Sequence, residues 1–234
     1  MLPCLVLRAR ACERAEAFNA VPSANGLVAR VRRALTGGAP AVVVLCGVGE
    51  PLLRARAQVR SLHQALLPVT IGLSARVSRS ATDGLAAWVA STCGPVGVDV
   101  QSEVTPIDPA LLGMTLHPQE AGWLADASNR EMAFTRLWAG KEAVLKALGV
   151  GLSWSPREVD ARPIATLVTP ATSAMPAPAL LPAWRDVHVP VLGRVWLTHL
   201  APPASLRVAV AVALNAGHAP VTGPFSWQVP PSPV

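Results

Sequence analysis

Residues 137–149 read Leu-Trp-Ala-Gly-Lys-Glu-Ala-Val-Leu-Lys-Ala-Leu-Gly and lie within the strongest helical pattern of the chain. Apolar side chains recur at helical spacing from about residue 131 to residue 148, at Phe134, Leu137, Val144, Leu145 and Leu148. Gly149 follows directly, and a glycine after the last periodic residue is a common helix stop. We therefore predict a helix over 131–148.

This helix carries two distinct sets of charged side chains. Trp138, Glu142 and Lys146 form a stripe at i, i+4 and i+8, whereas Lys141 falls inside the apolar arc. A lysine in an apolar arc must extend its ammonium to solvent or meet an anion. Glu142 and Lys146 form either a surface ion pair worth a few tenths of a kcal/mol or part of a chemical site.

The distribution of lysine in the chain favours the second interpretation, in which Glu142 and Lys146 belong to a chemical site. The chain has 20 basic residues, 18 of them arginine, and its two lysines, Lys141 and Lys146, share one six-residue window. An ammonium is a compact point charge that can approach a phosphate oxygen, whereas a guanidinium is a planar fork. We therefore expect this window to hold the chemistry of the protein.

Composition indicates an α/β protein with a substantial core. Of 234 residues, 51% are hydrophobic and 15% are charged, and the mean hydropathy is +0.40. A membrane helix needs roughly 18 consecutive apolar residues; the candidate stretches 34–49 and 163–184 are interrupted by glycine or proline, and the first seven residues are too short for a signal peptide. We expect a cytoplasmic protein that does not bind membranes.

The net charge of +6 suggests an acidic ligand or partner. Nucleic-acid binding is disfavoured, because the basic residues are dispersed and the chain has no tyrosine and only three phenylalanines for base stacking. The four cysteines lack metal-ligand spacing and are expected to be free thiols in a reducing compartment: Cys4, Cys12, Cys46 and Cys93.

Two predicted strands form a candidate hairpin. The runs 84–90 and 96–100 are apolar and are separated by a turn at 93–95. Asp99 lies in the second run among apolar neighbours, where a carboxylate is costly unless it is paired or binds a metal. Asp99 is therefore either a satisfied structural carboxylate or a metal ligand.

Weaker patterns surround these elements. We predict a short strand near Leu5, a helix at 25–35, a strand at 41–45 and a helix over 52–67 that carries Arg56 and Arg60 and ends by Pro68. Residues 73–80 form a polar segment. Residues 116–120 open a helix in which Glu120 is at least a first-turn dipole partner. The runs 193–199 and 205–213 predict a closing hairpin, and the last dozen or so residues a frayed tail.

Four blocks, taken in order, resemble the 4'-phosphopantetheinyl transferases of the surfactin-synthetase-activating type. They are Val-Ser-Arg-Ser at 77–80, Val-Gly-Val-Asp-Val-Gln at 96–101, His-Pro-Gln-Glu at 117–120, and the stretch at 137–149. The last block follows the family pattern Trp-x-x-Lys-Glu-(Ala/Ser)-x-x-Lys, and Gly-x-Gly-Leu follows it at 149–152. The resemblance spans roughly 50–213, with a weaker match in the arginine-bearing helix.

The resemblance implies transfer of the phosphopantetheine arm of coenzyme A to a serine of an apo acyl, peptidyl or aryl carrier protein, with release of adenosine 3',5'-bisphosphate. It implies an Mg²⁺ site, which Mn²⁺ can also fill, and an acidic carrier protein as partner. The implied metal ligands are Asp99, Gln101 and Glu142; the implied catalytic residues are Glu142, Lys146 and Glu120; and the implied coenzyme A contacts are Arg56, Arg60, Ser78, Arg79, Lys141 and Lys146.

The implied fold is an α/β pseudo-dimer, each half with a small antiparallel sheet packed on a helix. The halves are expected at 1–95, whose first fifty residues match poorly, and at 96–215, with a Pro-rich insertion at 163–182 and a Pro-rich tail at 216–234. A fused pseudo-dimer is expected to be a monomer.

Two positions depart from the family pattern. Arg79 stands where the family usually has histidine, and Gln101 stands where it often has a glutamate that binds the metal. A weakened relative that binds coenzyme A or a carrier protein without turnover is therefore the alternative function. A basic nucleic-acid or membrane-surface protein with an accidental motif match is the more distant rival.

Overall fold

A computed structural model describes residues 4–8, 24–37, 41–48, 52–83, 85–164, 183–200 and 207–217. These residues form two four-stranded antiparallel sheets. The first sheet has the order β1-β2-β4-β3, with β1 (Cys4–Arg8), β2 (Ala41–Val48), β3 (Arg76–Thr82) and β4 (Leu85–Ser91). The second has the order β5-β8-β7-β6, with β5 (Val96–Ser102), β6 (Arg185–Val189), β7 (Gly193–Leu200) and β8 (Val208–Leu214).

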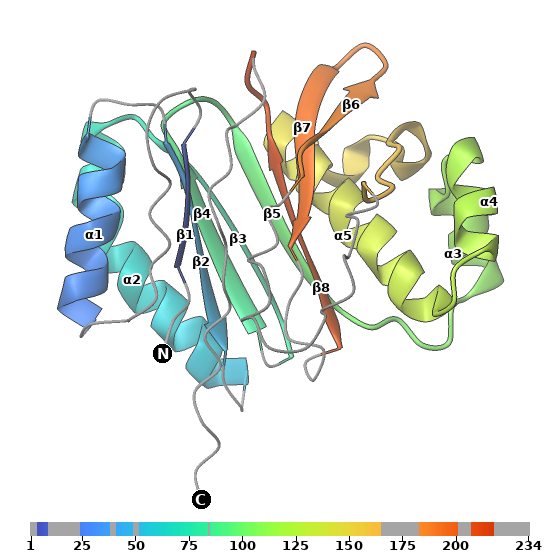
Figure 1. The fold of residues 1–234 in the computed structure, drawn as a ribbon, viewed down its shortest axis with the longest axis horizontal. Helices are drawn as coiled ribbons and strands as arrows, with labels where there is room; N and C mark the ends of the chain where they lie inside the picture. Colours follow the sequence, from blue (N-terminus) through green and yellow to red (C-terminus); the bar gives the residue numbers. More distant parts are fainter. Residues whose placement is uncertain are drawn as a thin grey trace, which may run out of the picture.

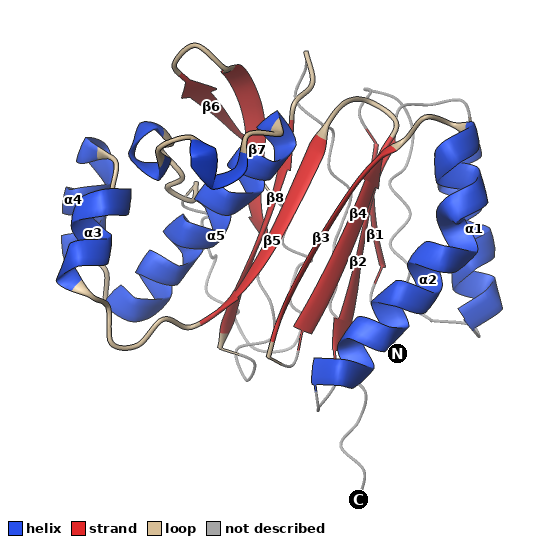
Figure 2. Ribbon diagram, turned by 180° about the vertical axis from the view of Figure 1, so that it is seen from behind, coloured by secondary structure: helices blue, strands red, loops and turns tan. Residues whose placement is uncertain are grey.

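The sheets face each other between two layers of helices, as Figure 1 shows. Helices α1 (Ala24–Thr36) and α2 (Leu52–Gly72) cover the outer face of the first sheet, and α5 (Arg130–Leu148) covers the outer face of the second (Figure 2). Short helices α3 (Pro109–Thr115) and α4 (Pro118–Ala125) lie beyond α5, and the turns η1 (Gly151–Ser153) and η2 (Pro156–Glu158) follow it.

Apolar residues fill the space between each pair of layers. Val44, Val89, Val98 and Val212 belong to the cluster between the two sheets, while Trp88 lies in the cluster under α1 and α2. Strands β4 and β8 are buried along their whole length because both faces of each are covered. This explains why they read as continuous apolar runs and not as alternating ones.

A glycine allows α5 to lie directly on β5. A Cβ atom at Gly97 would stand 2.0 Å from the carbonyl oxygen of Ala143 and 2.7 Å from the backbone nitrogen of Ala147. No side chain fits there, because both nearest atoms are helix backbone. The helix itself ends as predicted, with Gly149 in the left-handed conformation at φ 74°.

The proposed hairpin between 84–90 and 96–100 is wrong. Strand β4 pairs with β2 and β3, while β5 pairs with β8, so the two runs belong to different sheets. The turn at 92–95 carries the chain from one sheet to the other. The pattern of two apolar runs around a short turn does not distinguish a hairpin from this crossing.

Two further expectations are corrected. The second helix continues to Gly72 instead of ending by Pro68. Pro68 removes the hydrogen bond to the Gln64 carbonyl, but both residues are exposed, so water can replace that bond. Within the polar segment 73–80, residues from Arg76 onward form strand β3. Strand β6 and helix α3 had no sequence prediction.

The remaining elements follow the sequence patterns. The mixed α/β class, the strands near 5 and 41, the helices at 25–35 and 131–148, and the antiparallel pairing of 193–200 with 208–214 are confirmed. Most of the Pro-rich insertion and the tail from 218 lie outside the described residues, as do Cys12 and the residues around it. No helix in the described ranges is long and apolar enough to cross a membrane.

Candidate functional site

Asp99 is the centre of the site. Its side chain lies on β5 at 2% exposure and receives three hydrogen bonds. Oδ1 accepts from the Ser80 hydroxyl at 2.8 Å and from Lys146 Nζ at 2.5 Å, and Oδ2 accepts from Gln101 Nε2 at 2.8 Å. A buried carboxylate needs donors and an opposite charge to offset its lost hydration, and Asp99 has both.

Helix α5 brings Glu142 and Lys146 to this position, because residues four apart share a helix face. Lys146, 31% exposed, pairs with Asp99. The surface ion pair between Glu142 and Lys146, one of the two readings of the sequence, does not form. Within the described part of the chain, the Glu142 carboxylate has no hydrogen bond and no ion pair.

Burial and two charged neighbours nevertheless shift the pKa of Glu142. Burial raises the pKa of the Glu142 carboxyl, the negative charge of Asp99 raises it further, and Lys146 acts in the opposite direction. Two carboxylates whose charges act on each other in this way favour a proton or a cation as a partner. The single ammonium of Lys146, already bound to Asp99, leaves Glu142 without a counterion of its own.

These residues suit a hard divalent cation. Mg²⁺ is usually held by one or two carboxylates together with water and substrate phosphates, and Asp99 and Glu142 supply two. Gln101 donates its amide nitrogen to Asp99, which leaves its amide oxygen as a third candidate ligand. Among the described residues there is no group of three or more His, Cys, Asp or Glu side chains arranged to hold a metal. The third candidate ligand beside Asp99 and Glu142 is therefore the neutral Gln101.

Glu120 and Lys141 form a separate, fully buried pair. The Lys141 ammonium lies 2.7 Å from Glu120 Oε2 and donates to the backbone carbonyls of Pro156 and Val159. The Glu120 carboxylate also accepts from the backbone nitrogens of His117 and Ala161. Lys141 therefore meets an anion, as one of its two sequence readings required.

This pairing leaves neither residue available for substrate. All three protons of the Lys141 ammonium have acceptors, and both Glu120 oxygens have donors. Glu120 is 0% exposed and Lys141 is 1% exposed. Burial lowers the pKa of Lys141, and the charge of Glu120 opposes that shift. The geometry supports a structural role, and both residues are left out of the catalytic set proposed below.

The three predicted arginines lie on the other side of the first sheet. Arg56 and Arg60 are exposed on α2, and Arg79 is exposed on β3. Arg79 alternates with Ser78 and Ser80, so it points to the face that carries α2. There it approaches His63, whose pKa is lowered by burial and by the Arg79 charge. The described residues show no contact between these arginines and Asp99.

Ser78 and Ser80 point toward β5. The Ser78 hydroxyl accepts the backbone N–H of Val98 at 3.1 Å, whereas Ser80 is the residue of this block that reaches Asp99. Sequence reasoning singled out Ser78 and missed Ser80. The period of two along a strand was the available signal, because it places both serines on one face.

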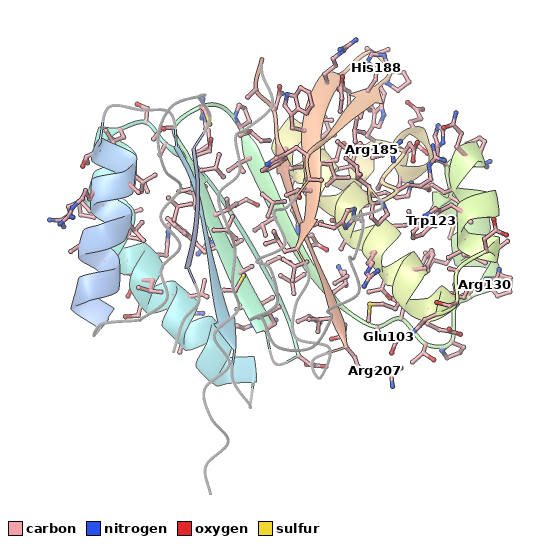
Figure 3. All side chains as sticks on the ribbon, in the orientation of Figure 1. Glu103, Trp123, Arg130, Arg185, His188 and Arg207 are labelled. Carbon is pink, nitrogen blue, oxygen red and sulfur yellow. The ribbon has the colours of Figure 1, made fainter. Side chains whose placement is uncertain are left out.

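An arginine and aspartate network joins β6 to the segment that follows η2. Asp160 binds the guanidinium groups of Arg162 and Arg185. Although burial raises the pKa of Asp160, hydrogen bonds from these two arginines hold it well below its usual range. Figure 3 shows Arg185 on β6, and the pair of Glu103 and Arg207 near the ends of β5 and β8. The first network ties the segment after η2 to β6, and the second pair ties the end of β5 to the start of β8.

The comparison with known families concerns the same part of the chain. The model of the 4'-phosphopantetheinyl transferase superfamily matches residues 95–185. This range contains β5 and helices α3 to α5, and with them Asp99, Glu142 and Lys146. The chain has no significant match among the curated proteins. Residues 95–185 are thus similar to a superfamily of transferases that move phosphopantetheine.

Proposed function

We propose that the protein is a 4'-phosphopantetheinyl transferase of the surfactin-synthetase-activating type. It transfers the phosphopantetheine arm of coenzyme A to a serine of an acidic apo carrier protein and releases adenosine 3',5'-bisphosphate. The reaction uses Mg²⁺, for which Mn²⁺ can substitute. The protein is a cytoplasmic monomer whose two halves, 1–95 and 96–215, form a fused pseudo-dimer.

One observation carries the proposal. A buried aspartate on β5 is paired with a lysine of α5, and both charges act on a glutamate without a hydrogen bond or ion pair one turn before that lysine, all within the superfamily match. The match gives the class of reaction, and the meeting of Asp99, Glu142 and Lys146 gives this chain a site suited to phosphate chemistry.

Glu142 has two roles in this proposal, and Asp99, Gln101 and Lys146 have one each. Asp99 and Glu142 would hold the metal, with the Gln101 amide oxygen as third protein ligand, and a metal held there would supply neutralisation of charge on the pyrophosphate. Lys146 contacts a phosphate oxygen with its partly exposed ammonium. Glu142 accepts the proton of the carrier serine as the serine oxygen bonds to the β-phosphorus of coenzyme A, and the phosphoanhydride bond breaks to release the bisphosphate.

The exposed arginines supply the remaining positive charge. Arg56, Arg60 and Arg79 bind the 3'-phosphate of coenzyme A on the α2 side of the first sheet, away from Asp99, since guanidinium groups form paired hydrogen bonds with phosphate. Ser78 is the neutral contact of the same block. A net charge of +6 speeds encounter with a polyanionic substrate and an acidic carrier protein.

A weakened relative that binds coenzyme A or a carrier protein is the second candidate. Gln101 favours it, because a neutral amide stands where the family often has a metal-binding glutamate, and its nitrogen is turned toward Asp99. Replacing Gln101 with glutamate is expected to tighten metal binding if this position faces the metal. An unchanged magnesium titration would place Gln101 away from the metal.

The test is incubation of the purified protein with coenzyme A, Mg²⁺ and a panel of apo carrier proteins, with intact masses as the readout. We expect addition of the phosphopantetheine arm to at least one carrier, and its loss with EDTA. Bound coenzyme A without a mass gain on any carrier would favour the binding module. Steeply salt-dependent DNA binding without coenzyme A binding would favour the basic-protein rival.

Variants connect the reaction to the site. Glu142→Ala and Lys146→Ala are expected to abolish transfer while leaving the thermal unfolding temperature near that of wild type. Glu131→Ala is the matched control. It removes a glutamate from the first turn of the same helix, far along α5 from Glu142. Near-native transfer by either site variant would refute its assigned role.

A further inference from the structure

Strands β3 and β5 are joined through side chains. They belong to different sheets, and three hydroxyl groups of β3 accept backbone N–H groups of β5. Ser78 accepts from Val98 at 3.1 Å, Ser80 from Val100 at 3.2 Å, and Thr82 from Ser102 at 3.1 Å. This hydroxyl ladder satisfies the edge donors of β5, which would otherwise be unpaired between the sheets.

Ser80 differs from its neighbours in the ladder. Its hydroxyl accepts the Val100 N–H and donates its own proton to Asp99 Oδ1 at 2.8 Å. The accepted bond fixes the oxygen, and the donated bond directs the proton at the carboxylate. In Thr82 the hydroxyl instead bonds to the Ser102 hydroxyl at 2.6 Å. Ser80 is therefore the ladder member whose hydrogen bonds connect the first sheet to the site.

The other two donors to Asp99 come from the second half of the chain. Lys146 extends from α5, and Gln101 lies two residues away on the same strand. Both have flexible side chains with terminal groups several bonds from the backbone. Ser80 has one side-chain torsion to its oxygen, and the Val100 N–H restricts that torsion. It is the most rigid of the three supports of the carboxylate.

We propose that Ser80 is a positioning residue that orients Asp99 for a divalent cation. The inference rests on the proposed function in assigning a cation to Asp99. Ser80 itself does not touch metal or substrate; its hydroxyl is held by the Val100 N–H and restrains Asp99 Oδ1, and with it the orientation of the carboxylate. Removing a hydrogen-bond partner of a ligating group typically weakens metal affinity by about 10- to 100-fold.

The test is a titration of the full chain with Mn²⁺ alone, with free Mn²⁺ measured by its electron paramagnetic resonance signal. Ser80→Ala is expected to raise the dissociation constant by about 10- to 100-fold, whereas Ser80→Thr, which keeps the hydroxyl, is expected to stay within about 3-fold of wild type. If Ser80→Ala does not fold, Ser80→Cys replaces it, because a thiol fills the space of the hydroxyl and is a weaker donor.

Thr82→Val is the matched control. It removes the same kind of link between β3 and β5 without touching Asp99, so its unfolding temperature should fall about as much as that of Ser80→Ala while Mn²⁺ affinity stays unchanged. Equal loss of affinity in both variants, or wild-type affinity in Ser80→Ala, would overturn the proposal.

The outcomes also separate this inference from the proposed function. If Ser80→Ala weakens Mn²⁺ binding and Thr82→Val does not, but no carrier protein is modified, the transferase function fails and the positioning role stands. If transfer occurs while Ser80→Ala binds Mn²⁺ as wild type does, the positioning role fails alone. If wild-type protein binds no Mn²⁺, both are overturned.

Discussion

Replacing Gly97 with alanine tests whether close packing of α5 on β5 builds the site. The new Cβ would start 2.0 Å from the Ala143 carbonyl oxygen, and the gap must widen by about 1.4 Å or more to reach the 3.4 Å at which ordinary contacts begin. Neither neighbour can yield by rotating a side chain, because both are backbone atoms of the helix. The helix must therefore move away from the strand.

This displacement has two measurable consequences. Overpacking of a core costs about 1–3 kcal/mol, and we expect the upper end because backbone has to shift. For a chain of this size, about 3 kcal/mol lowers the unfolding temperature by about 6–12 °C. The same shift separates Glu142 and Lys146 from Asp99, and a misplacement of about 1 Å can reduce catalysis about 100-fold.

The assays are thermal unfolding followed by circular dichroism and transfer to a carrier protein at a temperature where the variant is folded. Gly122→Ala is the control, since a Cβ at this exposed position of α4 meets nothing within 4 Å. It should stabilise the helix by about 0.5–1 kcal/mol and leave transfer unchanged. Wild-type unfolding temperature and wild-type transfer in Gly97→Ala would refute the reasoning.

The remaining predictions concern buried charges. Lys141→Met should lower the free energy of unfolding in urea by about 3–5 kcal/mol, because it leaves the fully buried Glu120 carboxylate without its cation. The coenzyme A affinity of the folded variant should not change. A stable variant that has lost coenzyme A binding would return Lys141 to the phosphate site. Burial lowers the pKa of His199 to about 4, so the unfolded state binds the proton more readily and stability should fall by about 3 kcal/mol as the pH drops from above 6.5 toward 4. His199→Gln should remove that part of the pH dependence, and an unchanged slope would contradict the neutral, buried imidazole.

The sequence predicted helical elements better than strand pairing. The periodicity of α5 and the glycine behind it fix both its existence and its end, since both signals are local. The pairing of β5 with β8 joins residues more than one hundred positions apart, and no local pattern encodes it. The short turn after β4 suggested the nearer partner, and that suggestion was wrong.

The candidate site likewise contains residues that the sequence identified and residues whose roles depend on tertiary contacts. Asp99, Glu142 and Lys146 were identified by residue type and by family resemblance, and the structure brings them together. Ser80 was missed because its role depends on two strands from different sheets lying side by side. The placement of Glu120 opposite Lys141 depends equally on tertiary contacts, since α4 and α5 are separate helices.

The restriction of both lysines to one window has a physical explanation in the structure. Each lysine meets a buried carboxylate, Lys141 with Glu120 and Lys146 with Asp99, from different faces of the same helix. Lys141 distributes three protons among one carboxylate and two backbone carbonyls, an arrangement that suits a compact ammonium better than a planar guanidinium. Only Lys146 keeps an exposed part that a substrate phosphate can approach. The rarity of lysine therefore marks two buried acidic partners, and only one of the two pairs is placed for chemistry.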